Sequence, residues 1–407
     1  MASTINTNIP SMNAQRNLGL SAGSLATSMQ RLSSGLRVNS AKDDAAGLAI
    51  AERMGTQVRG LAVAARNAND GISLAQTAEG ALGKVGDMLQ RMRELAVQAS
   101  NATNSKADRE ALQAEVKQLT DEVDRVAKQT SFNGQKILDG SFAGALFQVG
   151  ANSGENITVG ALTNSSAKGL SNVAYSQTAS AINVTTAVAS GIGTGAITGA
   201  NQLTIQVGSA TAVDLGEIKA AGSGVERLGQ VVQAINNKSA DTGVTAFLTK
   251  KDDGSYDLEF MSSKTTGTPP APETVTFGGT LGFSTANTGF AAPTLAAATG
   301  TAKTGIDNVK VDTQKDAWVA LKKIDSAIDQ INSSRADLGA LQSRFENSVS
   351  NIDIMSENIS ASRGRIVDAD FAKETANLSR TQILQQAGVA MVAQSNQLPQ
   401  QVLSLLR

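Results

Sequence analysis

Apolar residues near both ends of the chain recur in alternating steps of four and three positions. The first long run consists of Leu18, Ala22, Leu25, Met29, Leu32 and Leu36. Similar runs extend over about residues 47–100 and 112–126, and between them residues 100–105 have a composition typical of a loop. Such steps place apolar side chains on one face of a helix, as in the a and d positions of a heptad. The pattern therefore predicts long amphipathic helices, and the helix over 47–100 greatly exceeds the average length of about 11 residues.

The last quarter of the chain repeats this pattern. Residues 321–359 fit one heptad frame, and residues 384–405 form a final apolar line with glutamines on the opposite face. Pro399 predicts a kink or a break in the last helix. Because a heptad helix needs a partner, the C-terminal helices are the simplest partners for the N-terminal ones. The expected arrangement is an antiparallel bundle.

The middle of the chain has a different pattern. Residues 142–159 predict short strands in a hairpin, and residues 171–304 are rich in Thr, Ser, Ala and Gly. Within that region apolar and polar residues alternate over 203–207, and Asp253-Gly254 predicts a hairpin turn before another alternating strand. A helix is expected over 225–235. These signals together predict an inserted domain of the α+β type, rich in strands.

The fold class expected is mainly α, a long antiparallel coiled-coil or helical bundle built from both termini. It carries a β-hairpin region and the inserted α+β domain. The chain would form three nested layers, in which each segment near the N-terminus pairs with the matching segment near the C-terminus. Residues 1–46 pair with 361–407, residues 47–170 pair with 305–360, and 171–304 form the insertion.

The extreme ends of the chain are amphipathic but carry almost no charge. Residues 1–36 contain only Arg16 and Arg31 as charged residues, and residues 381–406 contain none. Short helices of this kind are marginally stable alone in water. They are consistent either with self-assembly against copies of the chain or with an ordinary intramolecular bundle, and the pattern alone does not choose between the two.

Composition narrows the classes of function. The chain has 407 residues, a formal net charge of −1, and neither cysteine nor histidine. The absence of cysteine excludes a disulfide framework and a thiol nucleophile. The absence of histidine excludes a Ser-His-Asp triad and a His-x-x-x-His metal helix. A charge near zero also argues against a dedicated nucleic-acid binder, which needs a basic face. We therefore expect no enzyme, no catalytic residue, no metal and no cofactor.

Neither a cleaved signal nor a membrane-inserted segment is expected. The first ten residues carry no Lys or Arg and lead into no apolar segment. The uncharged stretches 169–213 and 381–406 are interrupted by polar residues, so neither supplies the roughly 20 apolar residues of a membrane helix. The chain would be soluble as made, or would leave the cell by another route.

Several ordered, collinear runs of this sequence resemble bacterial flagellin. They are QRLSSGLRVNSAKDDAAGLAIA at 30–51, NANDGIS at 67–73, QTAEGAL at 76–82, FNG at 132–134, FQVG at 147–150, and 387–407, which ends in VLSLLR. The resemblance covers about residues 1–160 and 305–407. Residues 203–262 resemble, more weakly, a module inserted in some members of the family.

The resemblance implies a structural subunit that self-polymerises into the helical flagellar filament used for swimming. It implies an inner tube of terminal helices, an outer tube of the next helices, and a variable surface domain. The implied partners are other flagellin subunits, an export chaperone, the filament cap and the hook–filament junction proteins. The implied location is the extracellular flagellum, reached through the flagellar type III export system without a cleaved signal.

The inner-tube packing implied by the resemblance falls on apolar positions near both ends. These are Leu18, Leu25, Leu32, Leu36, Leu384, Met391, Leu398, Val402, Leu403, Leu405 and Leu406. The terminal leucines also resemble the segment recognised by intracellular inflammasome sensors. Core packing is taken as their primary role.

Two further sets of residues resemble surfaces recognised by host innate immune receptors. Arg91, Leu95 and Glu115 resemble the surface bound by Toll-like receptor 5 in vertebrates, although the sequence by itself also fits a solvated charged face with one core leucine. Asp43, Asp44 and Gly47 match an epitope sensed by plant receptors, although the acidic pair also fits the capping of a helix N-terminus.

Three alternatives to a filament subunit make different demands on the sequence. A hook–filament junction adaptor shares the terminal helices of the family but does not elongate alone. A zinc peptidase in the middle region would need a His-Glu-x-x-His helix, which a chain without histidine cannot form. An adhesin would be an added role of the middle domain.

Overall fold

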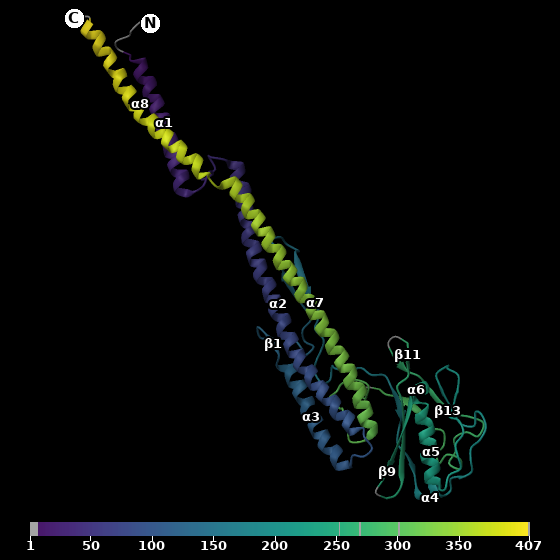
Figure 1. The fold of residues 1–407 in the computed structure, drawn as a ribbon. Helices are drawn as coiled ribbons and strands as arrows, with labels where there is room; N and C mark the ends of the chain where they lie inside the picture. Colours follow the sequence, from purple (N-terminus) through teal and green to yellow (C-terminus); the bar gives the residue numbers. More distant parts are fainter. Residues whose placement is uncertain (1–6, 252, 268–269, 300–301, 406–407) are drawn as a thin grey trace. The chain divides into compact units, whose positions relative to one another are not determined.

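The computed structural model describes residues 7–251, 253–267, 270–299 and 302–405, with the side chains described up to residue 397 (Figure 1). The chain forms two compact units. Unit 1 comprises Met1–Ile72, Leu146–Thr158 and Ser343–Arg407, and unit 2 comprises Ser73–Ala145 and Val159–Gln342. Each unit is described by itself.

Five long helices make the fold mainly helical, which confirms the expected fold class. They are α1 (Ile9–Ser34), α2 (Ala45–Ala99), α3 (Lys106–Gln129), α7 (Gln314–Val367) and α8 (Phe371–Leu405). The predicted break at Pro399 is wrong, because α8 continues as a helix through that position to Leu405. A proline removes one backbone hydrogen bond, and the remaining bonds of so long a helix hold its backbone.

Local sequence signals fix several of the helix ends. The Asn8 side chain accepts a hydrogen bond from the Ser11 backbone N–H at the start of α1. Gly35 ends this helix with a φ of 71°, a left-handed conformation that favours glycine. At the start of α3, Ser105 and Asp108 form a reciprocal capping box. These caps satisfy backbone groups that have no partner within the helix.

Helices α2 and α7 pack together within each unit, as the heptads predict. In unit 1, Leu61 and Ala64 of α2 form a small core with Ile352 of α7. Gly71 lies against the Phe345 ring, which also packs edge-on against Phe147, with 5.6 Å between the ring centroids. The hairpin of β3 (Ala145–Gln148) and β4 (Asn156–Val159) therefore adds its apolar face to the helix pair.

The helical part of unit 2 contains the second half of α2, α3 and the first half of α7. Its fully buried side chains include Leu82, Val85, Leu89, Met92, Val116, Val123, Ile324, Ile331 and Leu338. Ion pairs cross between the helices at the surface, such as the 2.7 Å contact between Arg93 Nε and Asp325 Oδ1. The loop predicted over residues 100–105 connects α2 and α3.

The middle region folds as two small sheets and a helix, which confirms its β-containing character. One sheet has the order β14-β5-β10-β6, and β9 also pairs with β10. Its strands are β5 (Ser176–Thr178), β6 (Ile182–Val184), β9 (Val244–Lys250), β10 (Tyr256–Ser262) and β14 (Leu295–Ala297). The second sheet has the order β13-β7-β8, from β13 (Val275–Gly278), β7 (Thr204–Val207) and β8 (Val213–Asp214). All of its pairings are antiparallel.

Smaller elements complete the middle region and its approaches. The helices are α4 (Thr186–Ser190), α5 (Gly224–Asn237) and α6 (Ser239–Thr242). The two-stranded ladders are β1 (Ser131–Phe132) with β2 (Gln135–Lys136), and β11 (Thr265–Thr266) with β12 (Ala271–Pro272).

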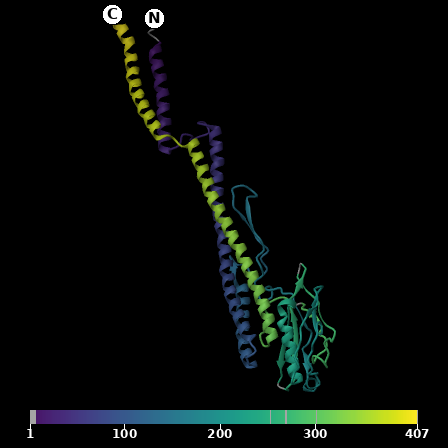
Figure 2. The same cartoon turned by 45° about the vertical axis from the view of Figure 1, so that its right-hand side comes forward.

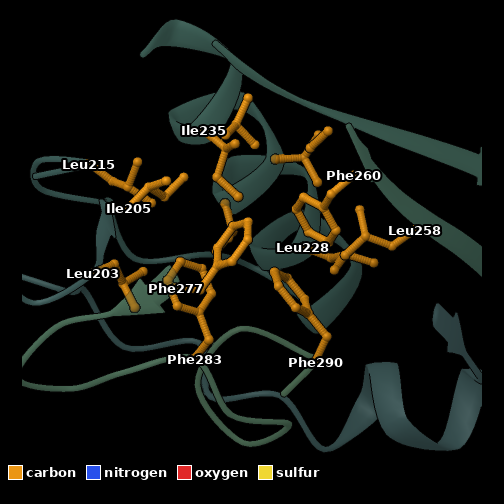
Figure 3. Close-up of a cluster of buried hydrophobic side chains, with 14 of the residues drawn as sticks. Leu203, Ile205, Leu215, Leu228, Ile235, Leu258, Phe260, Phe277, Phe283 and Phe290 are labelled. Carbon is orange, nitrogen blue, oxygen red and sulfur yellow. The ribbon is translucent and has the colours of Figure 1, made fainter. Parts of the chain in front are cut away.

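Four phenylalanines form the centre of the middle core (Figure 3). The rings of Phe260, Phe277, Phe283 and Phe290 form a closed circuit with centroid separations of 5.2–5.6 Å. Tilted and edge-on aromatic contacts of this kind add to the burial of apolar area. The region therefore has a hydrophobic core of its own.

The segments that enter and leave the middle region lie side by side. Asn172 and Thr304 form an antiparallel bridge, and the Val173 N–H donates to the Lys303 carbonyl at 3.0 Å. Nearby, Lys323 of α7 is 2% exposed. Its ammonium group donates to the Gly305 carbonyl at 3.1 Å and to Asn308 Oδ1 at 2.7 Å. The return segment is thus fastened to α7.

Burial lowers the pKa of Lys323 to about 8, against a weaker opposing effect of the Asp307 charge. Between pH 8 and 10.5 the unfolded chain binds more protons than the folded chain, so the free energy of unfolding rises with pH in this window. The measurement is the free energy of urea unfolding of the wild-type chain minus that of Lys323→Met. We expect this difference to rise by on the order of 2 kcal/mol between pH 7.5 and pH 10.

Lys84→Met provides the control for this measurement, because the Lys84 side chain is 78% exposed. Its stability difference from wild type should be the same at both values of pH. If the stability difference between Lys323→Met and wild type were also the same at both values of pH, the lowered pKa of Lys323 would be contradicted.

Candidate assembly and recognition surfaces

Helices α1 and α8 of unit 1 lie side by side and run antiparallel (Figures 1 and 2). At one end of the pair, Ser11 Oγ donates to Asn396 Oδ1 at 2.7 Å, and Asn8 Nδ2 donates to the Ser395 carbonyl at 2.8 Å. At the other end, Ser28 and Arg31 of α1 contact α8. Residues far apart in the sequence therefore define one long interface.

The line of α8 that faces α1 is made of small and polar residues at intervals of seven. Its members are Glu374, Thr381, Gly388 and Ser395. Three of them are less than 10% exposed, and Leu18 of α1 lies so close to Gly388 that an added Cβ would be 3.0 Å from Leu18 Cδ1. On α1 the buried side chains are Ser11 and Ser28. Small residues along this line let the two helix backbones approach closely.

Nine large apolar side chains of the two helices point away from this interface. In α1 they are Ile9, Met12, Leu20 and Met29, and in α8 they are Phe371, Ile383, Leu384, Val389 and Met391. All nine are between 50% and 66% exposed. Single exposed apolar residues are normal on a protein surface, but a concentration of them on one helix pair marks an interaction surface.

A charged contact sets the alignment of this pair. Arg31 donates to Glu374 Oε1 at 3.1 Å, and Ser28 Oγ donates to Glu374 Oε2 at 3.0 Å. Burial raises the pKa of Glu374, but the hydrogen bonds from Arg31 and Ser28 outweigh this effect and hold it below its ordinary value. Because a buried carboxylate without its partner is costly, sliding of the two helices is disfavoured.

The inner-tube positions expected from the resemblance divide into three groups. The first group is half-buried and consists of Leu18, Leu25, Leu32 and Leu36. Leu384 and Met391 are exposed. Leu398, Val402, Leu403 and Leu405 have side chains outside the described residues, and Leu406 is outside altogether. The sequence reasoning missed most of the outward-facing apolar residues, although the seven-residue spacing of small and polar residues in α8 could have located the contact line.

The connector between α1 and α2 holds the residues predicted as a plant-receptor epitope. Asp43 Oδ2 accepts hydrogen bonds from Ser40 Oγ and from the backbone N–H groups of Ser40 and Asn39, which lower the pKa of its carboxyl group. Asp44 Oδ1 accepts from the Gly47 N–H at 2.8 Å, at the start of α2. The acidic pair thus organises the connector and caps a helix, while recognition by a receptor stays a prediction.

The same connector pairs with the one between α7 and α8. The Arg37 N–H donates to the Val367 carbonyl at 2.6 Å, and the Ala369 N–H donates to the Gly35 carbonyl at 2.9 Å. Leu36 and Asp368 form an antiparallel bridge between them. The two connectors are therefore joined by backbone hydrogen bonds.

In unit 2, Arg91 and Glu115 meet at the surface, as the resemblance implies. Arg91 lies 2.9 Å from both Glu115 Oε1 and Glu94 Oε2. Hydrogen bonds to Glu115 and then to Glu94 raise the pKa of Arg91. Leu95 is only 1% exposed and belongs to the helical core. The structure thus brings the two charged residues together and turns Leu95 inward.

In the described part of the chain, no group of three or more acidic residues could hold a metal ion. No helix among the described residues is long and apolar enough to cross a membrane.

Comparison with known proteins identifies the family of the chain. The profile of the bacterial flagellin N-terminal helical region matches residues 5–143, and that of the C-terminal helical region matches residues 321–406. The chain belongs to the flagellin family. This is a structural family and not an enzyme family. The flagellin hook IN motif matches residues 202–264, the stretch that resembled an inserted module.

Curated flagellins match over the whole length of the chain. The chain is 41% identical to flagellin D of Vibrio anguillarum and 38% identical to B-type flagellin of Pseudomonas aeruginosa, with 100% of both sequences covered in each comparison. Among solved structures, FliC from Burkholderia pseudomallei is 23% identical and covers 67% of this chain and 99% of its own, with a TM-score of 0.38.

We predict that Gly388→Leu loosens the pairing of α1 with α8. Leucine favours a helix over glycine by about 0.8 kcal/mol, but at this position its side chain would push Leu18 away. Backbone amides of α1 should exchange with solvent at least about tenfold faster, measured by hydrogen exchange on the full chain.

Gly339→Leu in α7 is the matched control, because no atom lies within 4 Å of an added Cβ there. It should leave the exchange of α1 unchanged and slow exchange near residue 339. Unchanged α1 protection in Gly388→Leu would contradict the close approach.

Proposed function

We propose that this flagellar filament subunit self-polymerises through its terminal helices into a helical filament that drives swimming. The observation that carries the proposal is the outward orientation of the apolar side chains on α1 and α8. Intramolecular pairing uses the small and polar line of α8, so the apolar surface remains available to other subunits. Burying that surface between copies would supply the free energy of assembly.

The remaining partners follow from the same proposal. We infer export through the flagellar type III system without a cleaved signal, with help from an export chaperone, and assembly between the hook–filament junction proteins and the filament cap. The sparsely charged terminal helices support this inference, since helices of this kind are marginally stable alone and gain stability when they pack in an assembly.

We also propose that the subunit is a ligand of host innate immune receptors. The exposed pair of Arg91 and Glu115 supports binding by Toll-like receptor 5, with both charged groups presented on one surface. Leu95 would contribute by holding Arg91 in place, because its own side chain is buried. For a plant receptor, Asp43 and Asp44 would present the connector in a fixed conformation.

The double variant Leu384→Ser and Met391→Ser tests self-polymerisation. Full burial of each apolar side chain contributes about 1.5–3 kcal/mol, so seeded elongation by purified monomer should slow at least about tenfold. Thermal unfolding of the monomer should change little, because Leu384 is 50% and Met391 is 61% exposed. Filament growth from seeds is followed by light scattering and electron microscopy.

A double variant with the same replacement at exposed polar positions, Gln382→Ser and Gln394→Ser, is the control and should elongate normally. Normal elongation by the Leu384→Ser and Met391→Ser chain would rule out the apolar faces as the assembly surface. A wild-type chain that binds seeds without elongating them would fit a hook–filament junction adaptor instead.

A further inference from the structure

Sulfur occurs in this chain only in methionine. The sequence has nine methionines and no cysteine, together with no histidine and one tryptophan. Oxidants such as hydrogen peroxide attack exposed thiols and thioethers, so the thioethers are the main targets on a chain of this composition. The positions of the methionines therefore decide what oxidation does to the protein.

The methionines differ sharply in their exposure to solvent. Those whose side chains are buried or half-buried are Met54, Met88, Met92 and Met261. Those whose side chains are exposed are Met12, Met29, Met355 and Met391. Met1 lies outside the described residues. Three of the four exposed thioethers are on α1 and α8, where the side chains are between 56% and 61% exposed.

These three methionines lie at both ends of the pair that α1 forms with α8. Met12 follows Ser11, whose hydroxyl group donates to Asn396 Oδ1 of α8 at 2.7 Å, and Met391 precedes Asn396 by five residues. Both therefore belong to the same end of the pair. Met29 belongs to the other end, one residue after the serine that donates to the buried glutamate of α8. Oxidation would thus alter the apolar surface at each end.

Oxidation converts the apolar thioether into a polar group. The methionine sulfur attacks one oxygen of hydrogen peroxide, and an S–O bond forms as the O–O bond breaks. The sulfur is oxidised to a sulfoxide, and the peroxide is reduced to water. A sulfoxide oxygen that is covered by apolar side chains has no hydrogen-bond donor, and this makes its burial unfavourable.

We propose that Met12, Met29 and Met391 are oxidation sites at which peroxide blocks assembly of the subunit. In the free chain each sulfoxide faces water, so only the assembled state is disfavoured. The proposal rests on self-polymerisation through the terminal helices, and it adds chemical control of that step. The class of enzyme that must restore an oxidised chain is a methionine sulfoxide reductase acting before assembly.

Seeded elongation by oxidised monomer tests this control. Full-length monomer is treated with hydrogen peroxide, the excess peroxide is removed, and untreated seeds are added. The measured quantity is the elongation rate divided by that of the same chain before treatment. For wild type this ratio should fall at least about tenfold, and reductases for both sulfoxide epimers should restore it to within about twofold. Since the chain has no cysteine, the reductant cannot act on a thiol of the subunit.

The variant with Met12→Leu, Met29→Leu and Met391→Leu should keep a ratio within about twofold of one, because leucine has no sulfur to oxidise. Each chain is compared only with itself, so a change in its untreated rate does not enter the ratio. The matched control is Met355→Leu, which makes the same replacement at an exposed position of α7. It should be as sensitive to peroxide as wild type.

Peptide mass spectrometry of the treated monomer locates the added oxygen without reference to assembly. Met12, Met29 and Met391 should gain oxygen at least about tenfold faster than Met92 and Met261, whose side chains are fully buried. Equal rates at exposed and buried positions would contradict the assignment of the sites.

Treated wild-type chain that elongates at its untreated rate, or a three-site variant that is as sensitive as wild type, would overturn the proposed control while leaving self-polymerisation intact. Failure of untreated wild-type monomer to elongate seeds would instead refute the proposed function. The two failures are distinguishable, because only the first depends on the oxidant.

Discussion

The close approach of α1 to α8 along a line of small and polar residues is the constraint on which the assembly surface depends. A conventional heptad pair buries its large apolar side chains, and its assembly ends with two helices. Here Thr381, Gly388 and Ser395 occupy the contact line, and nine large apolar side chains of the two helices remain exposed. The helix pair has side-chain hydrogen bonds at both of its ends, but these nine side chains stay exposed. The apolar surface that stays exposed is the one proposed to contact further chains.

Charge is used sparingly in this pair, and its position determines alignment. Glu374 receives hydrogen bonds from both Ser28 and Arg31, and a shift of the helices by one heptad would leave this buried carboxylate without them. Pairs of this kind contribute more to the choice of register than to net stability. The bridged connectors at Leu36 and Asp368 extend the same restraint beyond the helix ends. Both terminal helices are therefore oriented by their connectors as a single element.

Much of the fold could be predicted from the sequence, because heptad spacing and turn residues are local signals. The long helices, the loop over 100–105 and the β-containing middle follow from them. The direction of the apolar residues on α1 and α8 could not be predicted in the same way. The heptad frame through Leu18 places Met29 in the seam, but the structure exposes it because Ser28 occupies that position against Glu374. By contrast, the buried position of Leu95 and the exposed position of Arg91 agree with the charged face and single core leucine that fit the sequence by itself.

The bridge between Asn172 and Thr304 has a consequence for how such a protein can change over evolution. It brings the entry and exit of the middle region next to each other, and that region has its own core around four phenylalanines. A domain attached through two adjacent chain segments can be enlarged, shortened or replaced without altering the distance that the flanking helices must span. The flanking helices thus form the constant part of the chain, and the middle region is a part that can be exchanged.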